Sequence, residues 1–193
     1  MLFRSAAFPE LAILRTELSP DEIAHLERLA VSWRLLADLS FSVLLLFAPV
    51  AHEDGHRFVI LAQVRPTTGQ TLYEADLVGQ VVTEEERPAA TRALHRAEVV
   101  ESATEHLGDG REIEVEAIPV AFRHRTVAVL CREFDTLSGR RVGDLERIYM
   151  DVYDDLVHMV VDGTFPFARE DLEIEGAPRV RSEEHTSELQ SHL

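Results

Sequence analysis

The sequence contains one cysteine and few basic residues, and each scarcity excludes a class of protein. A single thiol, Cys131, cannot form an internal disulfide or a cysteine-based metal site. Lys and Arg number 19 against 35 Asp and Glu, a formal net charge of -16, which repels nucleic-acid phosphates and anionic lipid. The longest apolar run, residues 41–51, is shorter than the roughly 20 residues that span a bilayer, and the N-terminus lacks the apolar region of a signal peptide. We therefore expect a cytoplasmic protein that binds neither nucleic acid nor membranes.

The remaining composition is that of a globular domain. Apolar residues make up 46% and charged residues 28% of the 193-residue chain, and a chain of this length buries a core without metals or disulfides. The last residues differ, because RSEEHTSELQSH, from Arg181 to His192, is polar and has no hydrophobic period. A disordered terminus has this character, but the string also resembles a translated sequencing adapter. We interpret residues 181–193 as an artefactual tail and expect the natural gene to continue beyond Val180.

One long helix is predicted near the N-terminus. Ser19 is a suitable cap, Pro20 suits the first helical position, and Glu22 completes a capping box. Apolar residues then recur at spacings of three and four up to about Leu39, which predicts a helix with one apolar stripe. The stripe consists of Ile23, Leu26, Leu29, Ala30, Trp33, Leu36 and Ala37.

The rest of the pattern predicts two antiparallel hairpins and two further helices. Asp54-Gly55 marks the turn of the first hairpin, and Arg123-His124-Arg125 marks that of the second. Three acidic residues, Glu84 to Glu86, favour the positive end of a helix dipole, so a helix is predicted to begin at about Thr83. The predicted strands are residues 41–47, 57–64, 112–120 and 126–131, and the helices are residues 83–97 and 142–160. Hairpins flanked by terminal helices indicate an α+β fold, with an antiparallel sheet and the N- and C-terminal helices packed on one face.

Five blocks of residues, in this order, resemble a known family. They are WRLLADLSF from Trp33, AQVRPTTG from Ala62, DLVG from Asp76, EAIPV from Glu116 and DLVHMVVDGTFP from Asp155. Over residues 11–180 the chain resembles the N-terminal GAF domain of PdtaS-type sensor histidine kinases. The resemblance implies a GAF-like sensor domain over residues 19–166, after a lead-in of residues 1–18. Residues 167–180 would then be a linker toward a PAS domain that is missing from this fragment.

In that family the GAF domain is the signal input of a two-component system. Phosphoacceptor and ATPase domains phosphorylate a response regulator, so ATP and magnesium are implied only for the missing kinase domains. The fragment itself is expected to hold no cofactor and to have no enzymatic activity. The resemblance also implies that the first and last helices pack side by side behind the sheet, with Trp33 and Leu36 near Ile148, Val152 and Leu156. It further implies a homodimer through this pair of terminal helices. The alternative is a free-standing GAF-like regulator that binds a small molecule.

The resemblance also implies a small-molecule site on the sheet face opposite the terminal helices. Its lid would be residues 67–107, called the lid segment below, which is the least periodic stretch of the sequence. The polar candidates for ligand binding are Gln63, Arg65, Thr68, Tyr73 and Asp76. Arg65 is the principal candidate because a guanidinium binds an anion through two parallel hydrogen bonds. Equally, Arg65 can pair with a carboxylate while Pro66 and Gly69 shape a turn.

Four further motifs each have two interpretations. His52-Glu53-Asp54-Gly55-His56 matches the zinc-protease motif H-E-x-x-H, but that motif needs a helix and Asp-Gly is typical of turns, so we favour a hairpin turn without metal. A redox role for Cys131 needs a resolving cysteine, which the chain lacks, so we favour a buried strand thiol. His158 lacks the surroundings of a phosphoacceptor histidine, and Glu84 to Glu86 are best explained as a solvated helix start.

Overall fold

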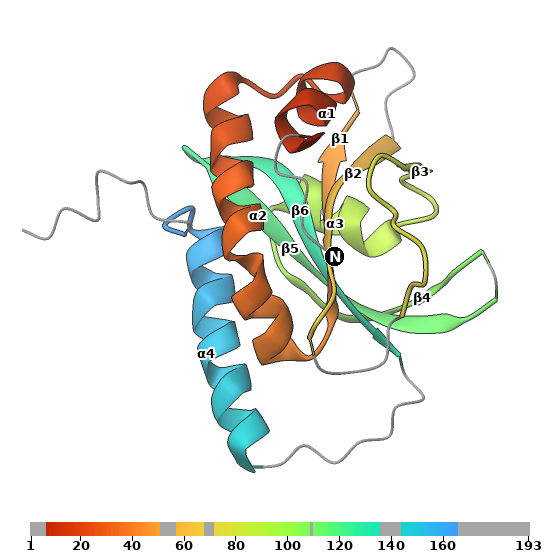
Figure 1. The fold of residues 1–193 in the computed structure, drawn as a ribbon, viewed down its shortest axis with the longest axis vertical. Coiled ribbons are helices and arrows are strands. Elements are labelled where there is room, and N and C mark those ends of the chain that lie inside the picture. The colour runs from red at the N-terminus through yellow and green to blue at the C-terminus, as the bar shows by residue number, and fades with distance from the viewer. Residues whose placement is uncertain (1–6, 51–56, 68–71, 109, 136–143, 166–193) are drawn as a thin grey trace, which may run out of the picture.

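The computed structural model of the chain describes residues 7–50, 57–67, 72–108, 110–135 and 144–165. Within these residues, six strands form one antiparallel sheet in the order β3-β2-β1-β6-β5-β4 (Figure 1). The elements are α1 (Ala7–Arg15), α2 (Pro20–Ser40), β1 (Val43–Pro49), β2 (Arg57–Val64), β3 (Val81–Thr83), α3 (Pro88–Arg96), β4 (Val100–His106), β5 (Glu112–Phe122), β6 (Arg125–Asp135) and α4 (Asp144–Val161). The predicted α+β fold and both predicted hairpins, β1–β2 and β5–β6, are confirmed.

Helix α2 begins and ends for local reasons. The Ser19 amide donates to the Glu22 carboxylate at 2.7 Å, and the Glu22 amide donates to the Ser19 hydroxyl at 3.4 Å, so the predicted capping box is present. The helix ends at Phe41, which adopts a left-handed conformation with φ of 50°. All seven residues of the predicted apolar stripe are buried. The predicted helix therefore forms with the predicted face inward.

Helices α1, α2 and α4 cover one face of the sheet, with α2 and α4 side by side (Figure 1). Their apolar residues form what we call the helix-side core, together with residues such as Leu44, Leu46, Ile118 and Leu130 from the sheet. Helix α1 lies in the segment expected to be a lead-in, and it buries Phe8 and Ala12 in this core. The sequence analysis did not anticipate α1, because the helix has only nine residues and its apolar residues lie on more than one side, so no clear period is visible.

The predicted inner face of α4 is partly wrong. Ile148 and Val152 are 58% and 44% exposed, whereas Tyr153 and Val160 are completely buried in the helix-side core. Leu156 packs against that core, as expected. Helix α4 carries apolar residues on more than one side, so its period alone did not determine which side faces the sheet. That choice depends on where the sheet and α2 lie.

The lid segment contains more regular structure than its sequence predicts. It includes the short strand β3 and the edge strand β4, neither of which was expected, and its helix α3 begins at Pro88 rather than at Thr83. A residue that precedes proline avoids the helical region, and Arg87 accordingly has φ of -132° and ψ of 63°. Proline itself suits the first turn of a helix. The sequence Arg87-Pro88 therefore determines where α3 begins.

A second apolar cluster, called the lid-side core, lies on the other face of the sheet. It combines sheet residues such as Leu45, Phe47, Phe58, Ile60 and Val115 with Tyr73, Ala89, Ala90 and Ala93 from the lid segment. The sheet is thus buried on both faces, by α1, α2 and α4 on one side and by the lid segment on the other. No helix in the described part of the chain is long and apolar enough to cross a membrane.

Candidate functional site

Polar side chains at the end of β2 hold the first part of the lid segment against the sheet. The Leu77 amide donates to the Gln63 side-chain oxygen at 2.8 Å. Arg65 Nη2 donates to the main-chain carbonyl oxygens of Glu74 and Ala75 at 3.3 and 2.5 Å. Two further polar atoms of these side chains, Gln63 Nε2 and Arg65 Nε, are buried and have no hydrogen-bond partner among the described residues. The structure therefore brings two of the predicted site residues together beneath one loop.

The other predicted site residues lie in three different settings. Asp76 is exposed, and its carboxylate accepts a hydrogen bond from the Val78 amide at 3.0 Å, which closes a local turn. Thr68 lies outside the described residues. Tyr73 is 8% exposed and packs in the lid-side core. Of the four candidates that the structure describes, Tyr73 is the one that is buried between the lid segment and the sheet.

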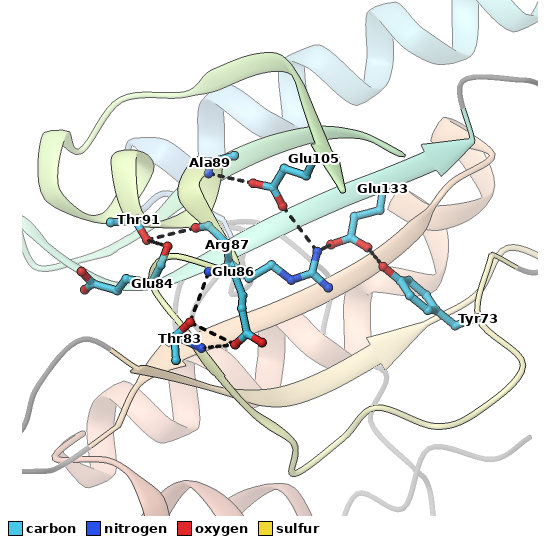
Figure 2. Close-up of polar contacts among 9 residues, drawn as sticks. All are labelled: Tyr73, Thr83, Glu84, Glu86, Arg87, Ala89, Thr91, Glu105 and Glu133. Carbon is cyan, nitrogen blue, oxygen red and sulfur yellow. Dashed lines mark hydrogen bonds and ion pairs between the residues drawn. The ribbon is translucent and has the colours of Figure 1, made fainter. Parts of the chain in front are cut away.

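Tyr73 is hydrogen-bonded to a group of buried charged residues that the sequence analysis did not predict. Its hydroxyl donates to Glu133 Oε2, and Arg87 Nη1 donates to Glu133 Oε1 at 2.9 Å. Arg87 Nη1 also lies 3.5 Å from Glu105 Oε2, and the Ala89 amide donates to Glu105 Oε1 at 2.8 Å. Figure 2 shows the Arg87 guanidinium between the two carboxylates, with Tyr73 on the far side of Glu133. We call Tyr73, Arg87, Glu105 and Glu133 the Arg87 cluster.

Three separate elements position the Arg87 cluster. Arg87 immediately precedes α3, and its guanidinium lies 5.4 Å from the centre of the Phe47 ring. Glu105 comes from β4 and Glu133 from β6. Just before Arg87 in the sequence, Thr83 and Glu86 form a reciprocal pair of hydrogen bonds (Figure 2). The Thr83 amide donates to the Glu86 carboxylate at 2.7 Å, and the Glu86 amide donates to the Thr83 hydroxyl at 3.2 Å. This local turn directs Arg87 toward the sheet.

The charges of the Arg87 cluster are almost removed from water. Arg87, Glu105 and Glu133 are 7%, 4% and 1% exposed. Burial raises the pKa of Glu133, the Arg87 charge acts in the opposite direction, and the Glu105 charge raises that pKa further. Burial by itself would lower the pKa of Arg87, but the neighbouring Glu133 carboxylate raises it. Two carboxylates share one guanidinium, so the cluster carries an excess of negative charge when both are ionised.

The sequence contains two signals of this cluster. Glu133 follows Val129 and Cys131 at the strand period of two, so a longer predicted strand would have placed a carboxylate on a buried face. Arg87 stands directly before Pro88, at a helix start where an acidic or small polar residue is more usual. Glu105 had no such signal, because its strand β4 was not predicted.

The thiol and phenol at this face are poor nucleophiles. Cys131 is 1% exposed, as a buried strand thiol should be, and burial raises its pKa well above the ordinary value, with the Glu133 charge acting in the same direction. Burial also raises the pKa of Tyr73. Both groups remain protonated at neutral pH. Neither the Cys131 thiol nor the Tyr73 phenol is therefore activated as a nucleophile at neutral pH.

Of the two remaining histidine motifs, one falls within the described residues. His158 is exposed on α4, and its ring lies 2.8 Å from the Asp154 carbonyl oxygen. The residues His52 to His56 lie outside the described part of the chain. Among the residues that the structure describes, no three His, Cys, Asp or Glu side chains are grouped as metal ligands.

Comparisons with known proteins agree on one family. The family described as "Histidine kinase PdtaS, GAF domain" matches residues 8–153. The chain is 32% identical over 175 residues to "Sensor histidine kinase PdtaS" of Mycolicibacterium smegmatis, covering 89% of this chain and 34% of that protein. It is 35% identical over 176 residues to the protein of the same name in Mycobacterium tuberculosis, covering 88% of this chain and again 34% of the relative. The chain thus spans about a third of the length of these relatives.

A solved structure extends this similarity to the fold. The "Sensor region of a sensor histidine kinase" superposes with a TM-score of 0.69 at 34% sequence identity. The similarity covers 84% of this chain and 56% of that structure. Sequence and fold therefore point to the same family.

Proposed function

The chain belongs to the family of PdtaS histidine kinase GAF domains, and on that premise we propose that it is the signal-input domain of a cytoplasmic two-component kinase. The observation that carries the proposal is the family match over residues 8–153, supported by the fold shared with a kinase sensor region. In the parent protein, ATP and magnesium serve the kinase region, and the phosphoryl group passes to a response regulator. The role of the sensor domain is to bind and to change conformation, without a chemical step of its own.

The proposed signal is a small molecule that binds between the lid segment and the sheet. Gln63, Arg65, Thr68, Tyr73 and Asp76 remain the proposed contacts, with Arg65 as the anchor for an anion. Support comes from Arg65 Nη2, which is bonded to neutral carbonyl oxygens of Glu74 and Ala75. A phosphate or carboxylate forms stronger, charge-assisted bonds with a guanidinium than a carbonyl does. An anionic ligand therefore competes for Arg65 and releases this part of the lid segment.

A homodimer through the terminal helices belongs to the same proposal. Val31 on α2 is 68% exposed, and Ile148 and Val152 on α4 are 58% and 44% exposed. These apolar side chains lie on the two helices that pack side by side (Figure 1). Burial of such residues against a second copy removes apolar surface from water. Sedimentation tests the proposed dimer. The unsubstituted chain should associate, whereas the double variant Ile148→Glu with Val152→Glu should be monomeric.

The sensor function is tested in a chimeric kinase. Residues 8–165 of this chain replace the matching segment of the Mycolicibacterium smegmatis relative, and autophosphorylation with ATP and magnesium is measured. We expect activity, and a change of at least fivefold when Arg87→Met disturbs the lid segment. Arg92→Met, an exposed position on α3, is the matched control and should change the rate less than twofold. The proposal is contradicted if the chimera autophosphorylates at the same rate as the relative's kinase without its GAF domain, and if neither substitution changes that rate.

The ligand site has its own test. Thermal unfolding of the chain is followed with inorganic phosphate and a panel of organic phosphates and carboxylates. A compound that raises the midpoint for the unsubstituted chain, and fails to do so for Arg65→Gln, supports the anionic site. A compound that stabilises both chains equally places the ligand elsewhere, and removes Arg65 from the proposal.

A further inference from the structure

Two neighbouring residues of β6, Arg132 and Glu133, reach opposite faces of the sheet. Successive side chains along a strand point to opposite sides. Glu133 accordingly lies in the Arg87 cluster, while Arg132 lies on the face covered by α2 and α4. Each of the two residues belongs to a mostly buried polar network. Two adjacent residues of β6 therefore take part in ion pairs on opposite faces of the sheet.

On the lid face, Glu133 is contacted from two parts of the lid segment. Tyr73 approaches from the loop that follows β2, and Arg87 from the start of α3. The Glu133 side chain is fully buried, and each of its two oxygens accepts one of these bonds. A shift of the lid segment therefore changes the contacts of Glu133.

On the helix face, Arg132 is joined to α4 through Glu116 of β5. Arg132 Nη1 lies 2.9 Å from Glu116 Oε2, and the Tyr153 hydroxyl of α4 donates to the same oxygen at 3.0 Å. The guanidinium also lies 5.2 Å from the centre of the Tyr153 ring and 4.7 Å from that of Phe134. Tyr153 is completely buried. Arg132, Glu116 and Tyr153 thus form a mostly buried polar contact between α4 and the sheet.

Strand β6 is held on both sides at this point. Arg132 and Glu133 pair with Leu44 and Val43 of β1, and with Glu116 and Val115 of β5. The two residues share one peptide group, so a rotation of that group displaces both side chains. A buried, paired strand has few other ways to relax, because packed interiors transmit strain. A disturbance at Glu133 is therefore passed to Arg132.

We propose that Arg132 and Glu133 form a coupling element that connects the state of the lid segment to the packing of α4. Loss of the Glu133 contacts with Tyr73 and Arg87 loosens the Arg132–Glu116–Tyr153 contacts, and α4 opens more often. The proposal deepens the proposed sensor function, since it names the path by which ligand binding at the lid reaches the last helix of the described chain.

Hydrogen exchange of the chain with Glu133→Gln tests the coupling. Exchange of main-chain amides reports local opening of each element. We expect amides of α4 between residues 152 and 161 to exchange at least fivefold faster, while those of α2 between residues 26 and 37 change less than twofold. Glu105→Gln is the matched control, because it disturbs the same Arg87 cluster from β4 rather than from β6, and should leave α4 unchanged.

A second pair of substitutions keeps the test decisive if Glu133→Gln does not fold. Tyr73→Phe removes a contact of Glu133 from the lid segment and should give the same pattern at smaller amplitude. Because coupling between two sites is reciprocal, Tyr153→Phe should accelerate exchange of α3 amides between residues 90 and 96. Equal acceleration in α2 and α4, or no acceleration in α4, overturns the proposal. These measurements need no kinase, so their failure is separable from failure of the chimeric kinase.

Discussion

The two cores of this domain differ in polarity. The helix-side core joins α1, α2 and α4 to the sheet mainly through apolar side chains such as Leu26, Trp33 and Leu130, and the polar contact of Tyr153 with Glu116 lies beside them. The lid-side core contains the Arg87 cluster. Its charged groups come from the residue before α3, from β4 and from β6, and they are at least nine-tenths buried. Apolar contacts are insensitive to charge, whereas a buried ion pair depends on every one of its partners.

The difference separates stability from responsiveness. Apolar side chains stabilise the fold in proportion to the surface that they remove from water, and a charged ligand does not compete for their contacts. In a buried ion pair, a charged group of a ligand can replace one partner, and a proton can neutralise the carboxylate. We infer that the helix-side core holds the domain together, and that the lid-side core is the face on which a signal can act.

The largest loss of stability is expected in the helix-side core. Trp33 is completely buried, and Trp33→Ala should lower the free energy of unfolding by about 3–5 kcal/mol. Urea unfolding followed by circular dichroism measures this. Val31→Ala, two residues away and 68% exposed, should change stability by less than about 0.5 kcal/mol. Comparable losses for both positions would contradict the assignment of this core.

A smaller loss is expected when the lid-side core is left with unpaired charge. Arg87→Met removes the cation from Glu105 and Glu133, for which the usual cost is about 3–5 kcal/mol. We expect about 3 kcal/mol, because the raised pKa of Glu133 allows that carboxyl to become neutral. In the double variant Arg87→Met with Glu133→Gln, part of the loss should be recovered. An additive loss instead would show that Arg87 acts by packing rather than by charge.

Loss of the α2 cap should cost less than either core substitution. Ser19→Ala removes the side-chain partner of the Glu22 amide, and caps of this kind contribute about 1 kcal/mol. Ser32→Ala in the middle of the same helix is the matched control, and it should be neutral or slightly stabilising since alanine is the better helix former. The midpoint of urea unfolding compares the two. A cap effect no larger than the control would show that the helix-side core alone maintains α2.

The two cores should also give pH dependences of opposite sign, with the smallest effects of this series. Burial lowers the pKa of His25, beside the helix-side core, below its ordinary 6.5, and the Arg28 charge acts in the same direction. The unfolded chain then binds the extra proton, so stability falls as the pH drops through 6.5. Burial raises the pKa of Glu133 above 4.5, so its contribution falls as the pH rises from 4.5 toward the folded-state pKa.

Substitution separates these two contributions. The midpoint of urea unfolding is measured as a function of pH between pH 4 and pH 8. Its change near pH 6 should disappear in His25→Gln, and its change above pH 4.5 should disappear in Glu133→Gln. His124→Gln, at an exposed hairpin turn, is the control for the histidine. Identical profiles for His25→Gln and the unsubstituted chain would mean that the ring of His25 is not withdrawn from water.

The sequence predicted the elements whose signals are local. The capping box of Ser19 and Glu22, the stripe of α2 and the strand over residues 57–64 all appear as predicted. The turn at Arg123 and His124 is also present, with both residues at positive φ. Each of these features depends on residues a few positions apart, so pattern and propensity decide it. The family resemblance likewise depended on short ordered blocks, and the family match confirms it.

The elements that the sequence analysis missed depend on distant partners. Within the described residues, strand β4 pairs with β5 alone, at the edge of the sheet. Four of its seven residues are exposed polar groups without a strand pattern. The inner side of α4 was ambiguous until α2 and the sheet were in place. The five predicted site residues were chosen along neighbouring stretches of chain, whereas the Arg87 cluster joins residues 73, 87, 105 and 133.

By itself, the sequence determined the family, the α+β class, the capped helix α2 and the two hairpins, because short-range patterns specify each of them. Only the tertiary structure decided that Arg87, rather than Arg65, is the buried cation of the lid-side core. It also decided that Arg132 and Glu133 face different networks on one strand. The physical reason is that the energy of a buried charge depends on which partners the fold brings to it, and those partners come from strands and helices far apart in the chain.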